Sequence, residues 1–121
     1  MKTILVIEDD ATLMEAYNLK FTSSGYAVLM ATTGEQGVAM VSEKAPDLII
    51  LDIMLPTGYD GMQVLKKLKS DPKTKLIPII MMTNIPNQTS QSIEAGALFY
   101  FVKSDISLDD LIAKIKDILK E

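Results

Sequence analysis

The stretch ILVIEDD, residues 4–10, joins a purely aliphatic run to three consecutive acids. An aliphatic run of this kind is typical of a strand in the core of a parallel sheet. Ionised carboxylates are seldom buried unless they are paired. A core strand that ends on Glu8, Asp9 and Asp10 therefore requires something to balance those charges, and the rest of the chain indicates what it is.

Four further apolar runs follow the first one, and segments with helical periodicity separate them. The last helical segment is the clearest, because its apolar residues between Leu108 and Leu119 form one stripe behind Ser107, a favourable N-cap residue. The segment after Thr83 is the weakest, since Pro86 and a polar stretch delay its helix. The predicted strands are Thr3–Ile7, Tyr26–Ala31, Leu48–Leu51, Ile77–Met82 and Leu98–Val102.

Strands that alternate with helices predict parallel βαβ units within one α/β domain over residues 1–121. Near-continuous apolar strands indicate a sheet that is covered on both faces. We therefore predict a flavodoxin-like doubly wound (βα)5 fold with a five-stranded parallel sheet in the order 2-1-3-4-5. In such sheets ligands bind at the carboxyl edge, at the switch point between strands 1 and 3.

The composition excludes several kinds of chemistry. The chain has no histidine and no cysteine, which rules out imidazole catalysis, thiolate metal sites and disulfides. Its net charge is −4 and all of its 12 basic residues are lysines, so we expect no direct binding of nucleic acid. The apolar runs are far shorter than a membrane span and no signal-peptide pattern precedes them, so we expect a cytoplasmic protein without membrane contact.

The predicted strands end on polar residues that belong at the same edge of the sheet. Strand 1 ends on Glu8 and Asp9, strand 3 on Asp52, strand 4 on Thr83 and strand 5 on Lys103. Adjacent carboxylates raise one another's pKa unless a cation holds them, and an all-oxygen site suits Mg²⁺ or Mn²⁺. Each residue alone also fits an ordinary role as a cap, a turn residue or a solvated side chain. The coincidence of four strand ends favours a site for a metal ion and a phosphoryl group.

Five segments together resemble one known family. "VIEDD", "DLIILDIMLP", "MMTN", "EAGA" and "YFVKS" occur in the order and at nearly the spacings of the receiver domain of two-component response regulators. The resemblance covers essentially the whole chain. It implies a signalling switch rather than an enzyme, phosphorylated by a sensor histidine kinase or phosphotransfer protein and read by an unidentified downstream protein. It also implies a monomer or weak dimer, and we expect a stand-alone phosphoacceptor without an output domain on this chain.

The resemblance also assigns the acidic residues. Asp52 is similar to the phosphoacceptor, whose carboxylate attacks the phosphorus of a phosphohistidine. Asp9 is similar to the main Mg²⁺ ligand, with Asp52 itself and the backbone carbonyl of Met54 completing the protein's share. Glu8 matches the second position of the acidic pocket and holds a metal-bound water. Asp10 lies one place beyond this pair, and we expect it to cap the first helix or to face solvent.

Three further residues match the family's phosphoryl-sensing positions. Lys103 is similar to the lysine that contacts the phosphoryl group. Thr83 and Tyr100 match the switch pair, a hydroxyl that moves toward the phosphate and an aromatic ring that turns inward behind it. Phosphorylation of Asp52 would then alter a partner surface made by the fourth helix, the fifth strand and the fifth helix. A static aromatic in the core is the alternative for Tyr100.

The chain departs from the family pattern in three places that concern the backbone. Ser104 follows Lys103 where the family usually has a cis proline; because a cis non-proline bond costs about 3–4 kcal/mol, we predict a trans bond here. The loop between Pro56 and Gly61 has one residue more than the common pattern. The segment 83–95 is short by about one helical turn, so the fourth helix is predicted to be short or shifted.

A fourth departure and two neighbouring residues concern the phosphoryl group. Asn84 stands where the family usually has a small residue beside the acceptor, which restricts access. Met54 and Ile85 lie two positions after Asp52 and Thr83, at positions that tune hydrolysis of the acyl phosphate in the family. Neither side chain can orient a water molecule by hydrogen bonding. Our hypothesis is a long-lived phosphoryl group.

Other functions fit the same residues less well. A phosphorelay intermediate or phosphate sink would use the same acceptor chemistry. A Mg²⁺-dependent phosphatase with an aspartyl-phosphate intermediate is a remote alternative, because Met54 stands where such an enzyme needs a second acid. A degenerate receiver that only binds partners is disfavoured by the intact set Glu8, Asp9, Asp52, Thr83 and Lys103.

Overall fold

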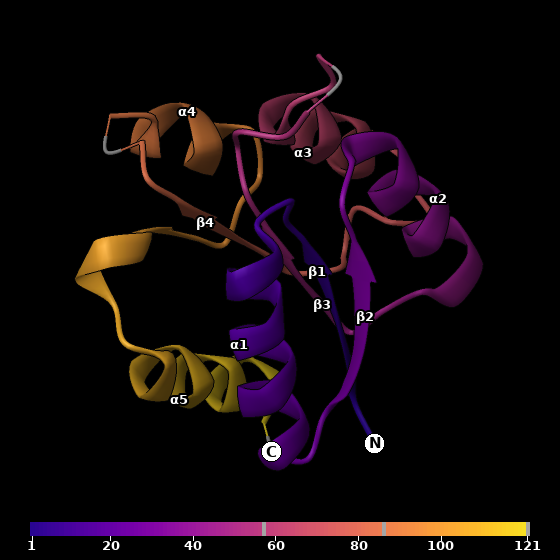
Figure 1. Cartoon of the computed structure of the whole chain (residues 1–121). Coiled ribbons are helices and arrows are strands. Elements are labelled where there is room, and N and C mark those ends of the chain that lie inside the picture. The colour runs from indigo at the N-terminus through magenta and orange to yellow at the C-terminus, as the bar shows by residue number, and fades with distance from the viewer. Residues whose placement is uncertain (57, 86, 121) are drawn as a thin grey trace.

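The computed structural model describes residues 1–56, 58–85 and 87–120, in which strands and helices alternate along the chain (Figure 1). A short 3₁₀ helix, Lys103–Asp105, follows the last strand. The elements are β1 (Thr3–Ile7), α1 (Ala11–Ser23), β2 (Ala27–Ala31), α2 (Gly34–Lys44), β3 (Leu48–Leu51), α3 (Gly61–Ser70), β4 (Ile79–Thr83), α4 (Thr89–Glu94), β5 (Phe99–Val102) and α5 (Leu108–Leu119).

All strand pairs in the sheet are parallel, and the order is β2-β1-β3-β4-β5. The predicted doubly wound fold and its strand order are therefore confirmed. The register matters for the site. Ile7 pairs with Leu51, so Glu8 and Asp52 leave β1 and β3 at matched positions. Thr83 at the end of β4 pairs with Val102, directly before Lys103.

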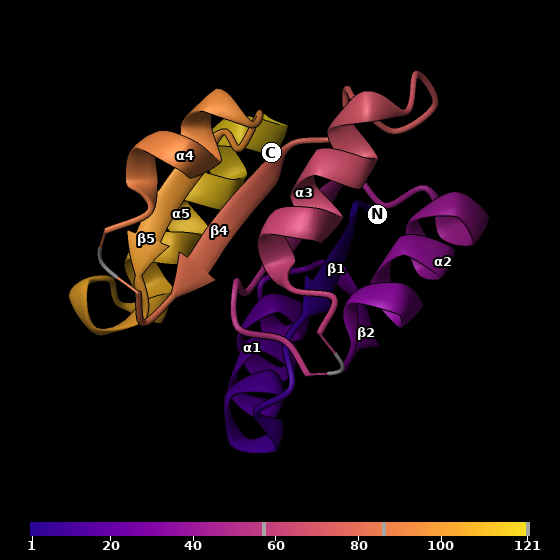
Figure 2. The same cartoon turned by 90° about the horizontal axis from the view of Figure 1, so that it is seen from above.

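Helices cover both faces of the sheet. Helices α1 and α5 lie on one face and α2, α3 and α4 on the other, as Figures 1 and 2 show. Neighbouring residues of β1 enter opposite halves of the core: Leu5 and Ile7 pack with α2 and α3, whereas Ile4 and Val6 pack with α1 and α5. This two-sided burial explains why the strands are apolar at nearly every position.

Three strands begin one or two residues later than predicted. The backbone N–H of Tyr26 donates to the carbonyl of Phe21, which ties it to the end of α1 rather than to the sheet. The N–H of Ile77 likewise donates to Thr74 within a turn. Leu98 donates to Ile79 but lies just before β5. The apolar run therefore overstates strand length where a turn precedes it.

The helix ends follow the predicted capping. The Asp10 carboxylate accepts a hydrogen bond from the N–H of Leu13, and the Ser107 hydroxyl accepts one from Asp110. Helix α4 has only six residues, as the short connecting segment predicted, although Pro86 itself lies outside the described residues. No described helix has the length and apolar character needed to cross a membrane.

The loop after β3 returns to the sheet edge before α3 begins. The N–H of Gly61 donates to the carbonyl of Ile53 at 2.7 Å. A side chain at Gly61 would collide with the backbone of Asp52 and Ile53, so only glycine permits this close approach. The extra residue predicted between Pro56 and Gly61 belongs to the segment that includes Thr57, which lies outside the described residues. Asp60 and Gln63 then form a capping box that starts α3.

Candidate functional site

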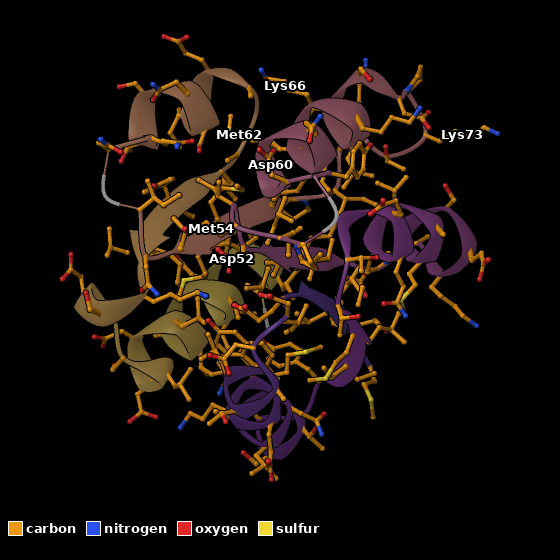
Figure 3. All side chains as sticks on the ribbon, turned by 45° about the horizontal axis from the view of Figure 1, so that its top comes forward. Asp52, Met54, Asp60, Met62, Lys66 and Lys73 are labelled. Carbon is orange, nitrogen blue, oxygen red and sulfur yellow. The ribbon has the colours of Figure 1, made fainter. Side chains whose placement is uncertain are left out.

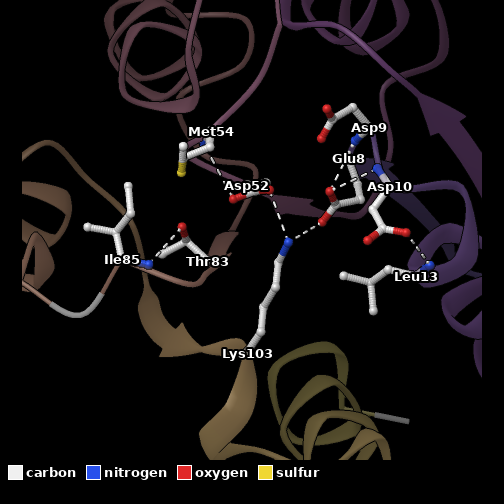
Figure 4. Close-up of polar contacts among 9 residues, drawn as sticks. All are labelled: Glu8, Asp9, Asp10, Leu13, Asp52, Met54, Thr83, Ile85 and Lys103. Atoms are coloured by element: carbon white, nitrogen blue, oxygen red, sulfur yellow. Dashed lines mark hydrogen bonds and ion pairs between the residues drawn. The ribbon is translucent and has the colours of Figure 1, made fainter.

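Three carboxylates meet at the carboxyl edge, where β1 and β3 end side by side (Figure 4). One oxygen from each of Glu8, Asp9 and Asp52 lies within 4.8 Å of the others. Glu8 and Asp52 are buried, with 2% and 6% of their surface exposed, whereas Asp9 is open to solvent. The structure therefore brings together the acids that the sequence placed at the ends of two separate strands.

Lys103 provides the cation that contacts these acids. Its Nζ lies 2.6 Å from Oε1 of Glu8 and 3.0 Å from Oδ2 of Asp52. Burial lowers the pKa of Lys103, but the hydrogen bonds to Glu8 and Asp52 outweigh this effect and leave its pKa raised. Burial also raises the pKa of Glu8, the hydrogen bond from Lys103 opposes the rise, and the negative charge of Asp52 adds to it.

Backbone groups hold the buried carboxylates in place. Oε2 of Glu8 accepts hydrogen bonds from the N–H groups of Asp9 and Asp10, at 3.1 and 3.2 Å. Oδ1 of Asp52 accepts one from the N–H of Met54 at 3.3 Å. The Asp10 side chain points to the helix instead and caps α1, as predicted. Two of the three acids of the opening stretch thus belong to the carboxylate cluster, and the third starts a helix.

The predicted switch pair is connected through the backbone of Ile85. The Thr83 hydroxyl, which is completely buried, accepts a hydrogen bond from the N–H of Ile85 at 3.3 Å. The Tyr100 hydroxyl donates to the carbonyl of the same residue. Burial raises the pKa of Tyr100. The sequence offered no signal for this link, because it uses only the main chain of Ile85.

A cavity of about 440 Å³ opens above the acids. It is lined by Glu8, Asp9, Asp10, Asp52, Met54, Thr83, Asn84 and Lys103. Every residue predicted to bind metal or phosphoryl therefore faces one space, whereas the predicted switch residue Tyr100 lies outside it. Asn84 and Met54 are both exposed at this cavity, and Met54 exposes 63% of its surface. The peptide bond between Lys103 and Ser104 is trans, as predicted.

Tyr17 is a neighbour of the site that sequence reasoning did not identify. It lies on α1 with 1% of its surface exposed and stacks on Phe21. Burial raises its pKa, and the negative charges of Glu8 and Asp52 raise it further. Helical periodicity had placed Tyr17 on the apolar face of its helix, which is correct but does not reveal that the ring lies within reach of the site's charges.

The donor set fits a divalent cation. The cluster offers only oxygen ligands, which Mg²⁺ and Mn²⁺ prefer, and two of its carboxylates are already oriented by backbone N–H groups. Three ionised carboxylates opposed by one lysine leave two uncompensated negative charges, which a divalent ion would balance. The arrangement therefore suits chemistry that depends on charge neutralisation by a cation and a lysine.

The parallel sheet with acids and a lysine at its switch point defines a class of phosphoacceptor proteins. The family described as the response regulator receiver domain matches residues 4–116 of this sequence, and the chain belongs to that family. Receiver domains are signalling switches of two-component systems that bind Mg²⁺ at an acidic pocket and interact with histidine kinases or phosphotransfer proteins.

Relatives of known sequence are longer than this chain. It is 37% identical to the phosphate regulon transcriptional regulatory protein PhoB of Pseudomonas aeruginosa, an alignment covering 98% of this chain and 52% of that protein. It is 34% identical to the response regulator PleD of Caulobacter vibrioides, covering 97% of this chain and 26% of that one. The chain thus spans about half or less of the length of these curated relatives.

Solved structures of similar proteins match nearly the whole chain. A putative response regulator from Chloroflexus aurantiacus superposes with a TM-score of 0.90 at 33% identity, covering 99% of this chain and 98% of that one. A CheY-like receiver domain protein from Methanospirillum hungatei gives 0.91 at 29% identity, covering 99% and 94%. The fold and its family are therefore established together.

Proposed function

We propose that residues 1–121 form one receiver domain in which Asp52 accepts a phosphoryl group from a phosphohistidine of a sensor kinase or phosphotransfer protein. The observation that carries this proposal is the position of Asp52. Its carboxylate is buried at the cavity, contacts Lys103 at 3.0 Å, and lies beside the carboxylates of Glu8 and Asp9. Glu8 shares the burial, the lysine contact and the place in the cluster, and Asp52 is taken as the acceptor because it also stands at the acceptor position of the receiver family.

The transfer needs few groups beyond these. A carboxylate oxygen of Asp52 forms a bond to phosphorus while the bond from phosphorus to the imidazole nitrogen breaks, and that nitrogen keeps the electron pair. Because such transition states need positioning and charge neutralisation more than proton transfer, an ammonium group beside the phosphoryl oxygens is well suited. Lys103 supplies it. The product is an acyl phosphate on Asp52.

Asp9, Asp52 and the backbone carbonyl of Met54 would hold Mg²⁺, with Mn²⁺ as the other fitting ion. When bound, the ion neutralises negative charge on the phosphoryl oxygens. Glu8 would contribute through a water molecule. Glu8 is also paired with Lys103, whose ammonium group balances the charge of this buried carboxylate.

The same chemistry supports a conformational signal. A phosphoryl group on Asp52 would accept a hydrogen bond from the Thr83 hydroxyl and draw its oxygen away from the N–H of Ile85, from which that oxygen now accepts. Since the Tyr100 hydroxyl donates to Ile85 as well, a shift of that residue would move the loop before α4 and the ring on β5 together. The altered surface would be the face made by α4, β5 and α5.

The acyl phosphate is expected to be long-lived. Hydrolysis requires a water molecule aligned opposite Asp52, and a polar side chain at the rim would align it. The side chains two residues after Asp52 and Thr83 are those of Met54, which lines the cavity, and Ile85, and neither offers a strong hydrogen-bond donor or acceptor. Decay of purified phosphoprotein in the presence of Mg²⁺ should take minutes or longer. A lifetime of seconds would contradict this expectation.

Intact-mass measurement after incubation with acetyl phosphate tests the central claim. We expect one phosphoryl group on the protein with Mg²⁺ and none after chelation. Asp52→Asn should abolish labelling, whereas the matched control Asp10→Asn should keep it, because Asp10 lines the same cavity but only caps α1. Labelling that persists in Asp52→Ala, or that needs no divalent ion, would overturn the proposal.

A further inference from the structure

The sequence segment KKLKSDPKTK, residues 66–75, concentrates positive charge in an acidic protein. It contains five lysines and one aspartate, so its net charge is +4, while the whole chain carries −4 and the remainder therefore −8. The segment forms the end of α3 and the turn that leads to β4. None of these lysines takes part in the site at the carboxyl edge.

One of the five lysines is used internally and makes the turn rigid. Nζ of Lys69 donates to the carbonyls of Lys75 and Ile77, at 2.9 and 2.7 Å, and burial lowers its pKa. The Thr74 hydroxyl donates to the carbonyl of Leu68 at 2.6 Å. A turn held from both sides presents its remaining side chains in a fixed arrangement, which reduces the entropic cost of binding.

The other lysines extend into solvent. Lys66 and Lys73 point away from the body of the molecule in Figure 3, and Lys67 and Lys75 are exposed as well. Lys66 lines the groove between α3 and α4, where Glu94 provides an opposite charge. We therefore define the lysine surface as Lys67, Lys73 and Lys75, together with Leu76, which follows directly and exposes 86% of its surface.

A cavity of about 330 Å³ lies beside this surface, between the end of α2 and the turn. Two of its polar groups already have partners: the Thr74 hydroxyl donates to the carbonyl of Leu68, and the Asp71 carboxylate accepts from the N–H of Lys73 at 2.9 Å. The walls of the pocket are polar and apolar in nearly equal parts: Val41, Ala45 and Ile77 supply an apolar part large enough for one side chain, and Lys73 adds a positive charge to the lining. The pocket is lined by Val41, Ser42, Ala45, Asp71, Lys73, Thr74 and Ile77.

We propose that the lysine surface and this cavity dock an acidic protein segment that inserts one aliphatic side chain into the pocket. Charge complementarity selects an acidic partner. The size of the cavity is at the lower end of the range for ligand pockets, which fits one side chain. A nucleic-acid backbone offers nothing apolar to fill the pocket, and a flat lipid surface does not enter a concave one.

The docking surface is separate from the phosphoryl site. The turn precedes β4, whereas Thr83 ends that strand, so the length of β4, about 15 Å, separates the two regions. Figure 2 shows the turn at the opposite end of α3 from the loop that follows β3. A partner on the lysine surface therefore leaves Asp52 accessible, and the proposal holds or fails independently of phosphorylation.

Fluorescence anisotropy with a fluorescein-labelled peptide, EEDLEDE, tests the proposal at low salt. We expect saturable binding that weakens about 10-fold when the central leucine of the peptide is replaced by serine. The double variant Lys73→Glu/Lys75→Glu should weaken it at least about 10-fold, since two attractive charges become repulsive. The matched control Lys2→Glu/Lys116→Glu changes the net charge equally at exposed positions elsewhere and should leave binding nearly unchanged.

A second variant and two competitors make the result decisive. Ser42→Glu places an acid at the cavity without altering the turn and should also weaken binding. Amide chemical shifts on adding the peptide should change most at Ser42, Thr74 and Ile77. The proposal is overturned if the peptide does not bind, if the control variant weakens it as much as the double variant, or if duplex DNA or phosphatidylserine vesicles bind more tightly than the peptide.

Discussion

Buried polar groups at the two edges of the sheet find their partners in opposite ways. At the carboxyl edge, Lys103 reaches Glu8 and Asp52 across 95 and 51 residues of sequence. At the amino edge, Lys69 and Thr74 bond to carbonyls only six to eight residues away. The first arrangement leaves negative charge uncompensated, whereas in the second the Thr74 hydroxyl and two of the three N–H groups of Lys69 donate to nearby carbonyls.

This difference distinguishes a site that can bind a ligand from a turn that only maintains the fold. Polar groups that are satisfied by neighbours in the chain fix a local shape and have no remaining capacity for a ligand. Polar groups that meet only through the fold, with more charge of one sign than the other, are stabilised further when a ligand binds. Four predictions test this contrast, in order of decreasing expected effect.

Removing the cation at the carboxyl edge should have the largest effect. Lys103→Met leaves the buried carboxylates of Glu8 and Asp52 facing each other, and we expect the free energy of unfolding to fall by about 3–5 kcal/mol. Urea denaturation measures it, and Mg²⁺ should restore part of the loss. Lys20→Met, which breaks the exposed ion pair with Asp109, is the control and should change stability far less. An equal loss of unfolding free energy in Lys103→Met and Lys20→Met would contradict this prediction.

At the amino edge, Thr74→Val should cost about 1–3 kcal/mol of unfolding free energy. The substitution keeps the shape of the side chain but leaves the buried carbonyl of Leu68 without its donor. Mg²⁺ should not restore the loss, because no ligand replaces a local hydrogen bond. Thr12→Val, at an exposed position of α1, is the matched control. A loss no greater than in this control would show that the turn does not depend on Thr74.

The two adjacent acids should differ in metal binding. Asp9→Asn removes a carboxylate from the cluster and should weaken Mg²⁺ binding by about 10-fold or more in isothermal titration calorimetry. Asp10→Asn should leave the affinity nearly unchanged, because Asp10 caps α1 and asparagine caps equally well. Similar losses in both variants would mean that the site responds to net charge rather than to the geometry of particular ligands.

Tyr17→Phe should have the smallest effect on the pH dependence of stability, and this effect is confined to high pH. The pKa of Tyr17 is raised by burial and by the charges of Glu8 and Asp52, so its hydroxyl stays neutral in the folded protein while it ionises in the unfolded chain above pH ~10. Stability conferred by the neutral hydroxyl is therefore present below that pH and is lost as pH rises. At pH 10.5 the extra loss in the wild type is about 0.8 kcal/mol. The prediction is wrong if the free energy of unfolding depends on pH in the same way in the wild type and in Tyr17→Phe.

Much of the fold could be predicted because its determinants are local. The apolar run before Glu8 and the alternation of strands and helices indicated a covered parallel sheet. Right-handed crossovers then left few strand orders, and the predicted one is correct. The capping roles of Asp10 and Ser107 followed from residue type alone. The predicted first residues of the strands were less accurate, because an apolar residue such as Ile77 forms its backbone hydrogen bond within the preceding turn and not in the sheet.

By itself, then, the sequence determined the order of the strands and which residues stand at their ends. Only the tertiary structure decided which of those residues touch. Lys103 contacts Glu8 and Asp52 because β1 and β3 end in register and β5 extends two residues further along the same edge. No spacing along the chain encodes this meeting. Ile85 joins Thr83 to Tyr100 through main-chain groups, which every residue type carries and no pattern can single out.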